Sequence, residues 1–270
     1  MKQLIINADD LGLSKLTNEG IIYCFTKGIV TSATVMANGY AYEHAVRLAK
    51  RHRGLGIGVH LNLTQAKPLT NALYGSNGDF SQYNIYKAMF GLLDARQVEK
   101  EFRAQIEKVI DSKIKPTHLD GHKHIHIFPK ISGIVVKLAK EYGIRAIRLP
   151  QNRITNYRLV LTKQMPKLML LQLYTRMAKK ELRQNGIATT KRFYGVLETG
   201  RLTTGNLGNL LLNMEQCTAE LMCHPGYYDL NLPCVLKEQR ETELKALTDK
   251  GIKSIITKRK IKLINYGALY

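Results

Sequence analysis

Residues 2–14 read KQLIINADDLGLS, an apolar run that passes directly into two adjacent carboxylates, Asp9 and Asp10, and then into a turn with Gly12. Successive side chains of a β-strand point to opposite faces, so inside a strand one aspartate would enter the core. At the carboxyl end of a strand both can project into a cleft, where one binds a metal ion and the other accepts a proton. An Asx-turn, or an N-cap for the helical pattern at residues 17–29, is the alternative for one aspartate, but it explains the pair less well.

Short β-branched runs recur along the chain and predict strands near residues 4–7, 29–38, 55–63, 117–120, 144–150, 219–225 and 254–257. Between most of them lie helical patterns, of which the clearest span residues 41–52, 95–112, 129–143 and 236–251. Alternating strands and helices predict an α/β fold with a parallel sheet, and about seven such units suit a barrel at least as well as an open sheet. In either architecture we expect the functional site at the carboxyl ends of the strands.

The chain of 270 residues is within the range of a single α/β barrel, and we expect one domain over residues 1–270. Two stretches depart from the alternation of strands and helices. Residues 64–84 form a turn-rich loop after the third predicted strand, and residues 151–192 form a basic, helical insertion. Long excursions of this kind in barrels usually shape access of the substrate to the site.

The charge balance is strongly basic, with 41 Lys and Arg against 21 Asp and Glu and a net charge of +20. Such a charge attracts phosphate, anionic lipid or nucleic acid, but the sequence has no nucleic-acid-binding motif, so we expect no specific nucleic-acid partner. No apolar run reaches the roughly 18 residues of a membrane span, and the N-terminus lacks a signal peptide, which predicts a soluble, cytoplasmic protein. The four cysteines show no metal-binding spacing and are expected to be packing residues.

Histidines are concentrated in two places. His60 lies at the end of a predicted strand, GIGVHLNL, where a lone histidine is more often a hydrogen-bonded core residue. The segment PTHLDGHKHIHIFP (116–129) holds Asp120 and four of the chain's eight histidines, His118, His122, His124 and His126. Several imidazoles on one face make a poor core, so the cluster predicts metal binding, although Gly121 interrupts both strand and helix periodicity.

One carboxylate and two imidazoles with open positions suit a catalytic Zn²⁺ or a similar divalent ion better than a closed structural site. Such an ion supports hydrolysis, in which a free carboxylate takes a proton and a second acid protonates the leaving group. His224, in MCHPGYY at another predicted strand end, is a candidate for that acid. The sequence contains no G-x-S-x-G elbow, P-loop or HExxH motif, so those chemistries are not expected.

Five motifs together cover most of the chain, in the order NADDLGLS, GIVTSATVMANG, GIGVHLNLT, PTHLDGHKHIHIFP and ELMCHPGY. In these motifs and their order the chain resembles the YdjC-like carbohydrate deacetylases. The resemblance implies a distorted TIM-like barrel that removes N-acetyl groups from amino sugars with one divalent metal ion, Mg²⁺ or Zn²⁺.

The resemblance also implies roles for individual residues. Asp9 is expected to be the general base and His224 the acid. The metal ligands are expected to be Asp10, His60 and His122. His124 and His126 line the sugar pocket or orient the ligands from behind, and Arg148, in AIRLP, orients the base.

The segment that begins GIATTKRFYGVLETG (186–200) is more similar to the hopanoid-biosynthesis-associated branch, which acts on a sugar joined to a lipid. The positive charge departs from that branch and favours a phosphate-bearing or isoprenoid-phosphate-linked sugar. Residues 167–184 have apolar side chains at helical spacing beside a basic face, so they form either an outer barrel helix or a helix at the inner membrane face. Peripheral contact with an anionic membrane and homodimerisation are both left open.

Two alternative functions remain. One is a metal-dependent phosphoesterase or sugar-phosphate isomerase on a similar barrel, which would use the same ligand types and the basic charge. The other is a basic surface-binding protein whose site is vestigial.

Overall fold

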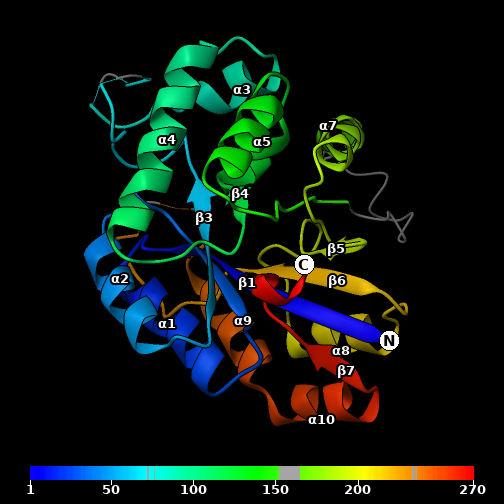
Figure 1. Ribbon diagram of the computed structural model, residues 1–270. Coiled ribbons are helices and arrows are strands. Elements are labelled where there is room, and N and C mark those ends of the chain that lie inside the picture. Colours follow the sequence, from blue (N-terminus) through cyan, green and yellow to red (C-terminus); the bar gives the residue numbers. More distant parts are fainter. Residues whose placement is uncertain (72, 76, 152–164, 233, 235) are drawn as a thin grey trace.

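The computed structural model describes residues 1–71, 73–75, 77–151, 165–232, 234 and 236–270 (Figure 1). Its sheet has the strand order β4-β3-β2-β1-β6-β5, with β7 paired to β1, and every pairing between strands is parallel. The strands are β1 (Lys2–Leu11), β2 (Ser32–Val35), β3 (Gly56–Leu61), β4 (Leu119–Gly121), β5 (Arg192–Tyr194), β6 (Thr218–Cys223) and β7 (Ile261–Leu263). The parallel sheet curves into a half-barrel, so the predicted α/β fold of the distorted TIM type is confirmed.

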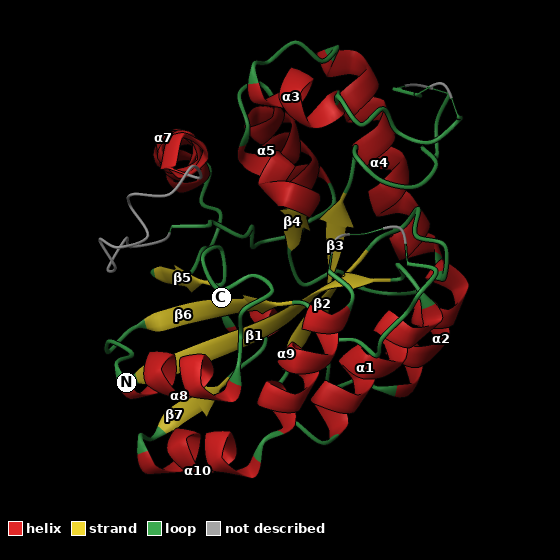
Figure 2. Cartoon of the chain, turned by 180° about the vertical axis from the view of Figure 1, so that it is seen from behind, coloured by secondary structure: helices red, strands yellow, loops and turns green. Residues whose placement is uncertain are grey.

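Helices cover the outside of this sheet, and Figure 2 shows them from behind. They are α1 (Lys15–Thr26), α2 (Tyr42–Arg51), α3 (Asn84–Met89), α4 (Ala95–Asp111), α5 (Ile131–Glu141), α7 (Met165–Gln184), α8 (Thr204–Leu212), α9 (Glu238–Thr248) and α10 (Lys250–Lys258). Local capping explains where several of them begin: Ser14, Asp94 and Asp249 each accept a hydrogen bond from a backbone N–H of the first turn of α1, α4 and α10. Short 3₁₀ segments follow β4 (His122–Ile127) and β7 (Tyr266–Ala268).

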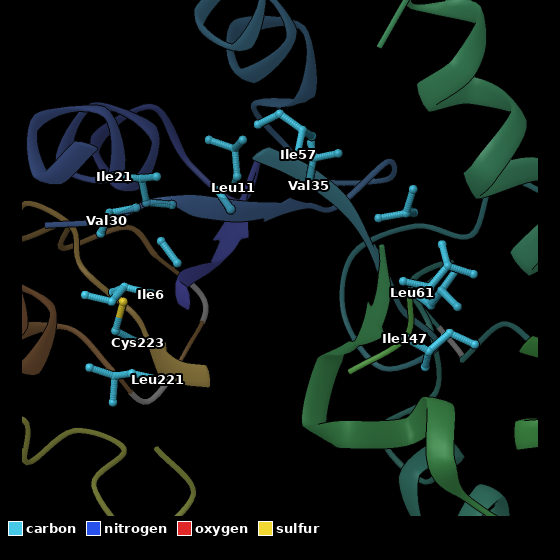
Figure 3. Packing of buried hydrophobic residues seen from close by; sticks show 14 of the residues in the cluster. Ile6, Leu11, Ile21, Val30, Val35, Ile57, Leu61, Ile147, Leu221 and Cys223 are labelled. Atoms are coloured by element: carbon cyan, nitrogen blue, oxygen red, sulfur yellow. The ribbon is translucent and has the colours of Figure 1, made fainter. Parts of the chain in front are cut away.

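The two faces of β1 have different surroundings. Leu4, Ile6 and Ala8 belong to the main apolar core, part of which Figure 3 shows with Ile6 near Leu221 and Cys223 of β6. Ile5 belongs instead to a small second cluster with Ala146, Ile264 and Tyr266. Because side chains alternate along a strand, Asn7 and Asp9 share the face of Ile5, and the amide of Asn7 donates to Asp9 Oδ1 over 2.9 Å. This face is the inside of the half-barrel, and it becomes polar toward the carboxyl end of β1.

Two predicted strands are wrong. Residues 254–257 lie in α10, because Ile252 and Ile256 fall one helical turn apart and both are buried. Residues 144–150 form only two isolated parallel bridges, Leu119–Ile147 and Ala146–Ala188, instead of a continuous strand. The short strands β5 and β7 were not expected from the sequence.

The basic insertion expected at residues 151–192 is described only in part, since residues 152–164 lie outside the described chain. Its described portion contains α7, which lies apart from the sheet beside α5 and the segment after β4 (Figure 1). Among the described residues, no helix combines the length and the apolar character needed to cross a membrane.

Candidate active site

The predicted site residues lie at or just after the carboxyl ends of four strands and meet at one edge of the sheet. Parallel strands bring their carboxyl ends together, and the register pairs Ala8 of β1 with Cys223 of β6, one residue before Asp9 and His224. On the other side, β3 and β4 pair His60 with Asp120. A cavity of about 560 Å³ opens at this edge, and its lining includes Asp9, Asp10, His60, His122, His124, His224 and Arg240.

A break in the regular strand explains how two neighbouring aspartates reach one cavity. The pairing of β1 with β2 shifts register between Ala8 and Leu11, and Asp10 takes a left-handed conformation with φ of 67°. An extra residue in one strand re-aims the side chains that follow it, and aspartate tolerates positive φ better than most residues. Both carboxylates therefore line the cavity, with side chains almost completely buried.

Asp9 is held by Arg148. The two terminal nitrogens of the guanidinium donate to the two carboxylate oxygens, each over 2.7 Å. Burial by itself would raise the pKa of Asp9, but the charge of Arg148 and its hydrogen bonds outweigh burial and lower it well below the usual range. Asp9 is thus ionised at neutral pH and held in one orientation, able to accept a proton.

Arg148 also binds two further buried carboxylates. Its Nη1 lies 2.7 Å from Asp120 Oδ2, and its Nε donates to Glu220 Oε1 over 2.8 Å. Tyr266 donates its hydroxyl to the other oxygen of Glu220. Burial raises the pKa of Glu220 to about 7, with Arg148 opposing the shift. All three nitrogens of Arg148 are therefore occupied by the protein itself.

Asp10 has a different environment. Its Oδ2 accepts from Arg240 Nη2 over 2.6 Å, whereas its Oδ1 is buried without a hydrogen-bond partner among the described residues. Burial raises and Arg240 lowers the pKa of Asp10, and the net pKa lies far below the usual range. The free Oδ1 is 3.5 Å from His60 Nε2, so an anionic oxygen and an imidazole nitrogen face each other without a normal hydrogen bond.

Both neighbouring imidazoles are oriented by their other nitrogen. His60 Nδ1 is 2.7 Å from Asp120 Oδ1, and His122 Nδ1 is 2.7 Å from the hydroxyl of Thr64. This pattern is typical of metal-binding histidines, because a partner on one nitrogen directs the other toward the ion. Burial lowers the pKa of His122 to about 3, so its ring is neutral and able to coordinate. Burial would lower the pKa of His60 as well, but the neighbouring carboxylates raise it to about 9, so a bound ion would have to displace a proton from this ring. With that proton displaced, Asp10, His60 and His122 offer the donor types that a divalent ion takes.

A second grouping overlaps with this one. Asp9, His60 and Asp120 each offer a donor atom within 4.8 Å of the others, and this buried Asp-His-Asp group could also hold a metal ion. However, Arg148 already contacts both of its carboxylates, and a cation would have to share them with a guanidinium. The free oxygen of Asp10, in contrast, has no such competitor among the described residues.

His224 lines the cavity directly after β6. Its backbone N–H donates to the buried Glu243 of α9 over 2.5 Å, and its Nδ1 has no partner among the described residues. Glu243 also accepts from the backbone N–H of Gly200. The carboxylate of Glu243 thus holds the backbone of His224, while the imidazole of His224 lines the cavity.

The other three histidines of the 116–129 cluster have different surroundings. His124 lines the cavity and packs edge-on against Phe193, with ring centroids 5.8 Å apart. His126 contacts the carbonyl oxygen of Arg148 over 3.0 Å, so it lies behind the base and its arginine. His118 is fully buried and stacks on Tyr266 with centroids 3.6 Å apart. Left-handed φ values at Lys123 and His124 produce this divergence of neighbouring side chains.

The cavity has an apolar arm, which is lined by side chains of two helices. These are Ile85 and Met89 of α3 and Leu168, Leu171 and Tyr174 of α7. The hydroxyl of Tyr174 donates to the carbonyl of Met89 over 2.7 Å and so joins the two helices. The arm gives the site room for an apolar group beside the polar end.

Sequence reasoning placed Asp120 only within the predicted metal-binding cluster, and it assigned no role to four other polar residues of the site, namely Thr64, Glu220, Arg240 and Glu243. A signal existed for Glu220, an acid within the apolar strand AELMC, where burial requires a cationic partner. Arg240 and Glu243 lie in a helix rich in charges, and nothing in that pattern distinguishes them from exposed residues.

Comparisons with known proteins find relatives over almost the whole chain. The family described as YdjC-like protein matches residues 3–258. A carbohydrate deacetylase of Geobacillus stearothermophilus is 36% identical over 98% of this chain and 97% of that protein. A chitooligosaccharide deacetylase of Escherichia fergusonii is 34% identical over 97% of each chain.

Among solved structures, a putative cellobiose-phosphate cleavage protein of Enterococcus faecalis V583 has a similar fold. It superposes with a TM-score of 0.80 at 28% identity and covers 99% of this chain and 98% of that one. An uncharacterized protein of Agrobacterium tumefaciens C58, at 13% identity and a TM-score of 0.55, shares the fold only; it covers 100% of this chain and 89% of that one.

Proposed function

The chain belongs to the YdjC-like family, and on this premise we propose that it is a metal-dependent hydrolase that removes N-acetyl groups from an amino sugar. The observation that carries the proposal is the division of labour between the adjacent aspartates. Asp9 is locked by Arg148, whereas Asp10 keeps a free oxygen 3.5 Å from an imidazole nitrogen. The relatives named as carbohydrate and chitooligosaccharide deacetylases support the choice of acyl chemistry over phosphate chemistry.

In this proposal Asp10, His60 and His122 hold one divalent ion, Mg²⁺ or Zn²⁺. When bound, the ion supplies Lewis acidity to the substrate carbonyl and acidifies a water molecule. Asp9 takes a proton from the attacking water, and Arg148 keeps its carboxylate aimed at the cavity. His224 donates a proton to the leaving amine nitrogen, since it is the imidazole that follows the adjoining strand. His124 contacts the sugar, and His126 supports Arg148 from behind.

The substrate is proposed to be a conjugate instead of a short free sugar. The apolar arm between α3 and α7 accommodates a hydrophobic aglycone, and a net charge of +20 favours a phosphate-bearing or membrane-associated one. The expectation drawn from the segment that begins at residue 186, that the substrate joins a sugar to a lipid, is part of the same proposal. Residues 1–270 are proposed to act as a single barrel domain.

Paired variants of the two aspartates test the proposal. Asp10→Asn should lower metal content, measured by elemental analysis of purified protein, because it weakens the free oxygen's charge. Asp9→Asn should leave the metal bound and reduce acetate release by about 10²–10⁴-fold, the usual contribution of a general base. Acetate release, and the matching 42 Da loss by mass spectrometry, would be followed on acetylated oligosaccharides and glycolipids.

Phosphate release from sugar phosphates would be measured in parallel with acetate. Phosphate without acetate would replace this proposal by a phosphoesterase, and near wild-type turnover of Asp9→Asn would remove Asp9 from the role of base. Failure of the wild-type protein to bind any divalent ion would favour a vestigial site.

A further inference from the structure

Arg240 is the second buried arginine of the site, and its contacts are incomplete. Its side chain comes from α9, is 1% exposed and lines the same cavity as Asp10 and His224. Nη2 donates to Asp10 Oδ2 over 2.6 Å, and Nε donates to the carbonyl oxygen of Leu236 over 3.1 Å. Nη1 is buried and has no hydrogen-bond partner among the described residues.

Arg148, the other buried arginine of the site, has no unpaired nitrogen of this kind. Arg148 is equally buried, yet all three of its nitrogens bind carboxylates. A buried polar group without a partner costs about 1–3 kcal/mol, and more when it is charged, so native proteins rarely leave one. Arg240 differs in that it borders the cavity, where a ligand can supply the missing acceptor.

We propose that Nη1 of Arg240 donates to the acyl oxygen of the substrate during hydrolysis and to the carboxylate of the acetate product. The inference rests on the proposed deacetylase function and assigns a further catalytic contact to it. Nη2 binds one oxygen of Asp10 and the other oxygen faces His60, so the guanidinium borders the same cavity as the free oxygen of Asp10. An acyl oxygen bound beside Asp10 would supply the acceptor that Nη1 lacks.

The charge changes of the reaction favour this acceptor over a neutral sugar hydroxyl. Water adds to the carbonyl carbon, one of its protons goes to Asp9, and the electron pair of the carbonyl moves to the acyl oxygen. When the C–N bond breaks, His224 gives a proton to the amine nitrogen and the acyl product is acetic acid; its remaining hydroxyl proton passes to the now neutral His224, which leaves the negative charge on acetate. A fixed guanidinium donor in a buried site stabilises that charge more than it stabilises the neutral amide, which is the requirement for catalysis.

Arg240→Lys is the informative variant, because an ammonium group can still pair with Asp10 but cannot also supply a second nitrogen in the place of Nη1. We expect its affinity for the divalent ion, measured by calorimetric titration of Mg²⁺ or Zn²⁺, to stay within about threefold of wild type. Its binding of sodium acetate, measured by the same method on metal-loaded protein, should weaken by about 10–100-fold, as expected for one charge-assisted hydrogen bond. The value of kcat should fall by a similar factor.

Arg240→Gln keeps one donor for Asp10 and also lacks Nη1, so it reports on the same contact if the lysine variant does not fold. Arg192→Lys, at an exposed pair with Glu215, is the matched control and should leave both titrations unchanged. Acetate binding and kcat at wild-type level in a folded Arg240 variant would overturn the inference. So would a parallel loss of metal and acetate affinity, because Arg240 would then act only through Asp10. A wild-type protein that binds metal but releases no acetate would instead overturn the proposed function.

Discussion

Arg148 is surrounded by three carboxylates, and this arrangement places the base. Asp9, Asp120 and Glu220 all lie within 2.8 Å of its guanidinium, and none of the four side chains is more than slightly exposed. Removing one partner from a buried ion pair leaves an uncompensated charge and typically costs about 3–5 kcal/mol. The cluster therefore orients Asp9, and we expect replacement of any one of its members to destabilise the fold.

Glu220→Gln tests whether the far side of this cluster positions the base. The amide weakens the hydrogen bond to Arg148 Nε, so we expect a loss of about 1.5–3 kcal/mol in the free energy of unfolding, measured with urea. Because Arg148 then holds Asp9 less firmly, kcat for acetate release should fall about 10-fold, with metal affinity retained. Glu215→Gln, at the exposed pair with Arg192, should cost below about 1 kcal/mol and leave kcat unchanged. Equal effects of the two variants would argue against a positioning role.

His118 should make the fold sensitive to acid. Burial lowers its pKa to about 3, while the unfolded chain titrates near 6.5, so between these values the unfolded state binds the extra proton. Stability from this group is complete above about pH 6.5 and is lost as pH falls, by up to about 1.4 kcal/mol per pH unit. His118→Phe keeps the stacking on Tyr266 and should reduce the slope of unfolding free energy against pH between 4 and 6.5. Parallel curves for the two proteins would contradict the assignment.

At the scale of elements, α1 determines the position of the loop that carries His224. A Cβ atom on Gly20 of α1 would lie 2.5 Å from the Cα of Gly226, so the helix and the loop are in backbone contact. Gly226 follows His224 by two residues, and its N–H donates to the carbonyl of Arg240. One helix thus supports a segment that joins both the proposed acid and the arginine beside Asp10.

Gly20→Ala should displace this loop. Alanine favours the helix by about 0.5–1 kcal/mol, but the overlap with backbone atoms should outweigh that gain and destabilise the fold by about 1–3 kcal/mol. We also expect kcat to fall, because His224 moves, whereas binding of Mg²⁺ or Zn²⁺ should remain. Gly205→Ala in α8 is the control, since its Cβ would meet only Thr203 Oγ1 at 4.0 Å, and it should retain stability and activity. A stable, fully active Gly20→Ala protein would show that the loop is held by other contacts.

For the whole molecule, α7 contributes one face to the apolar arm of the cavity and another to the outer surface. Leu171 and Tyr174 face the cavity, while Met169, Leu173 and Met177 are between 51% and 61% exposed at successive helical turns. Exposed cations lie on the same helix at Arg176, Lys179, Lys180 and Arg183. Apolar side chains beside cations are typical of helices that lie at an anionic membrane surface.

Co-sedimentation with anionic liposomes tests this arrangement. We expect the protein to bind at low salt and to be released as salt rises, because near-surface cations contribute about 1 kcal/mol each and are screened. Replacing Lys179, Lys180 and Arg183 with Glu should abolish binding and preserve activity on short soluble sugars. A wild-type protein that stays in the supernatant at low salt would leave α7 as an outer helix of the fold and make a soluble substrate the better choice.

The sequence by itself determined the α/β fold and the place of the site. Asp9, Asp10, His60 and His224 each stand at the end of an apolar run, and parallel strands must bring such ends to one edge. Hydrophobic patterning is local and can be read without knowing the tertiary structure. The prediction failed at residues 254–257, where a β-branched run typical of a strand also fits the spacing of a helix and packs as one.

Only the tertiary structure decided which charges meet. Arg148 and Asp9 are 139 residues apart in the chain, and Arg240 and Asp10 are 230 apart. Arg148 is singled out only by the family resemblance at AIRLP, and nothing local to Arg240 distinguishes it from the other cations of a chain with 41 Lys and Arg residues. Burial selects these two, because a guanidinium is stable in the interior only where the fold places carboxylates around it. The separate roles of two adjacent aspartates follow from that placement.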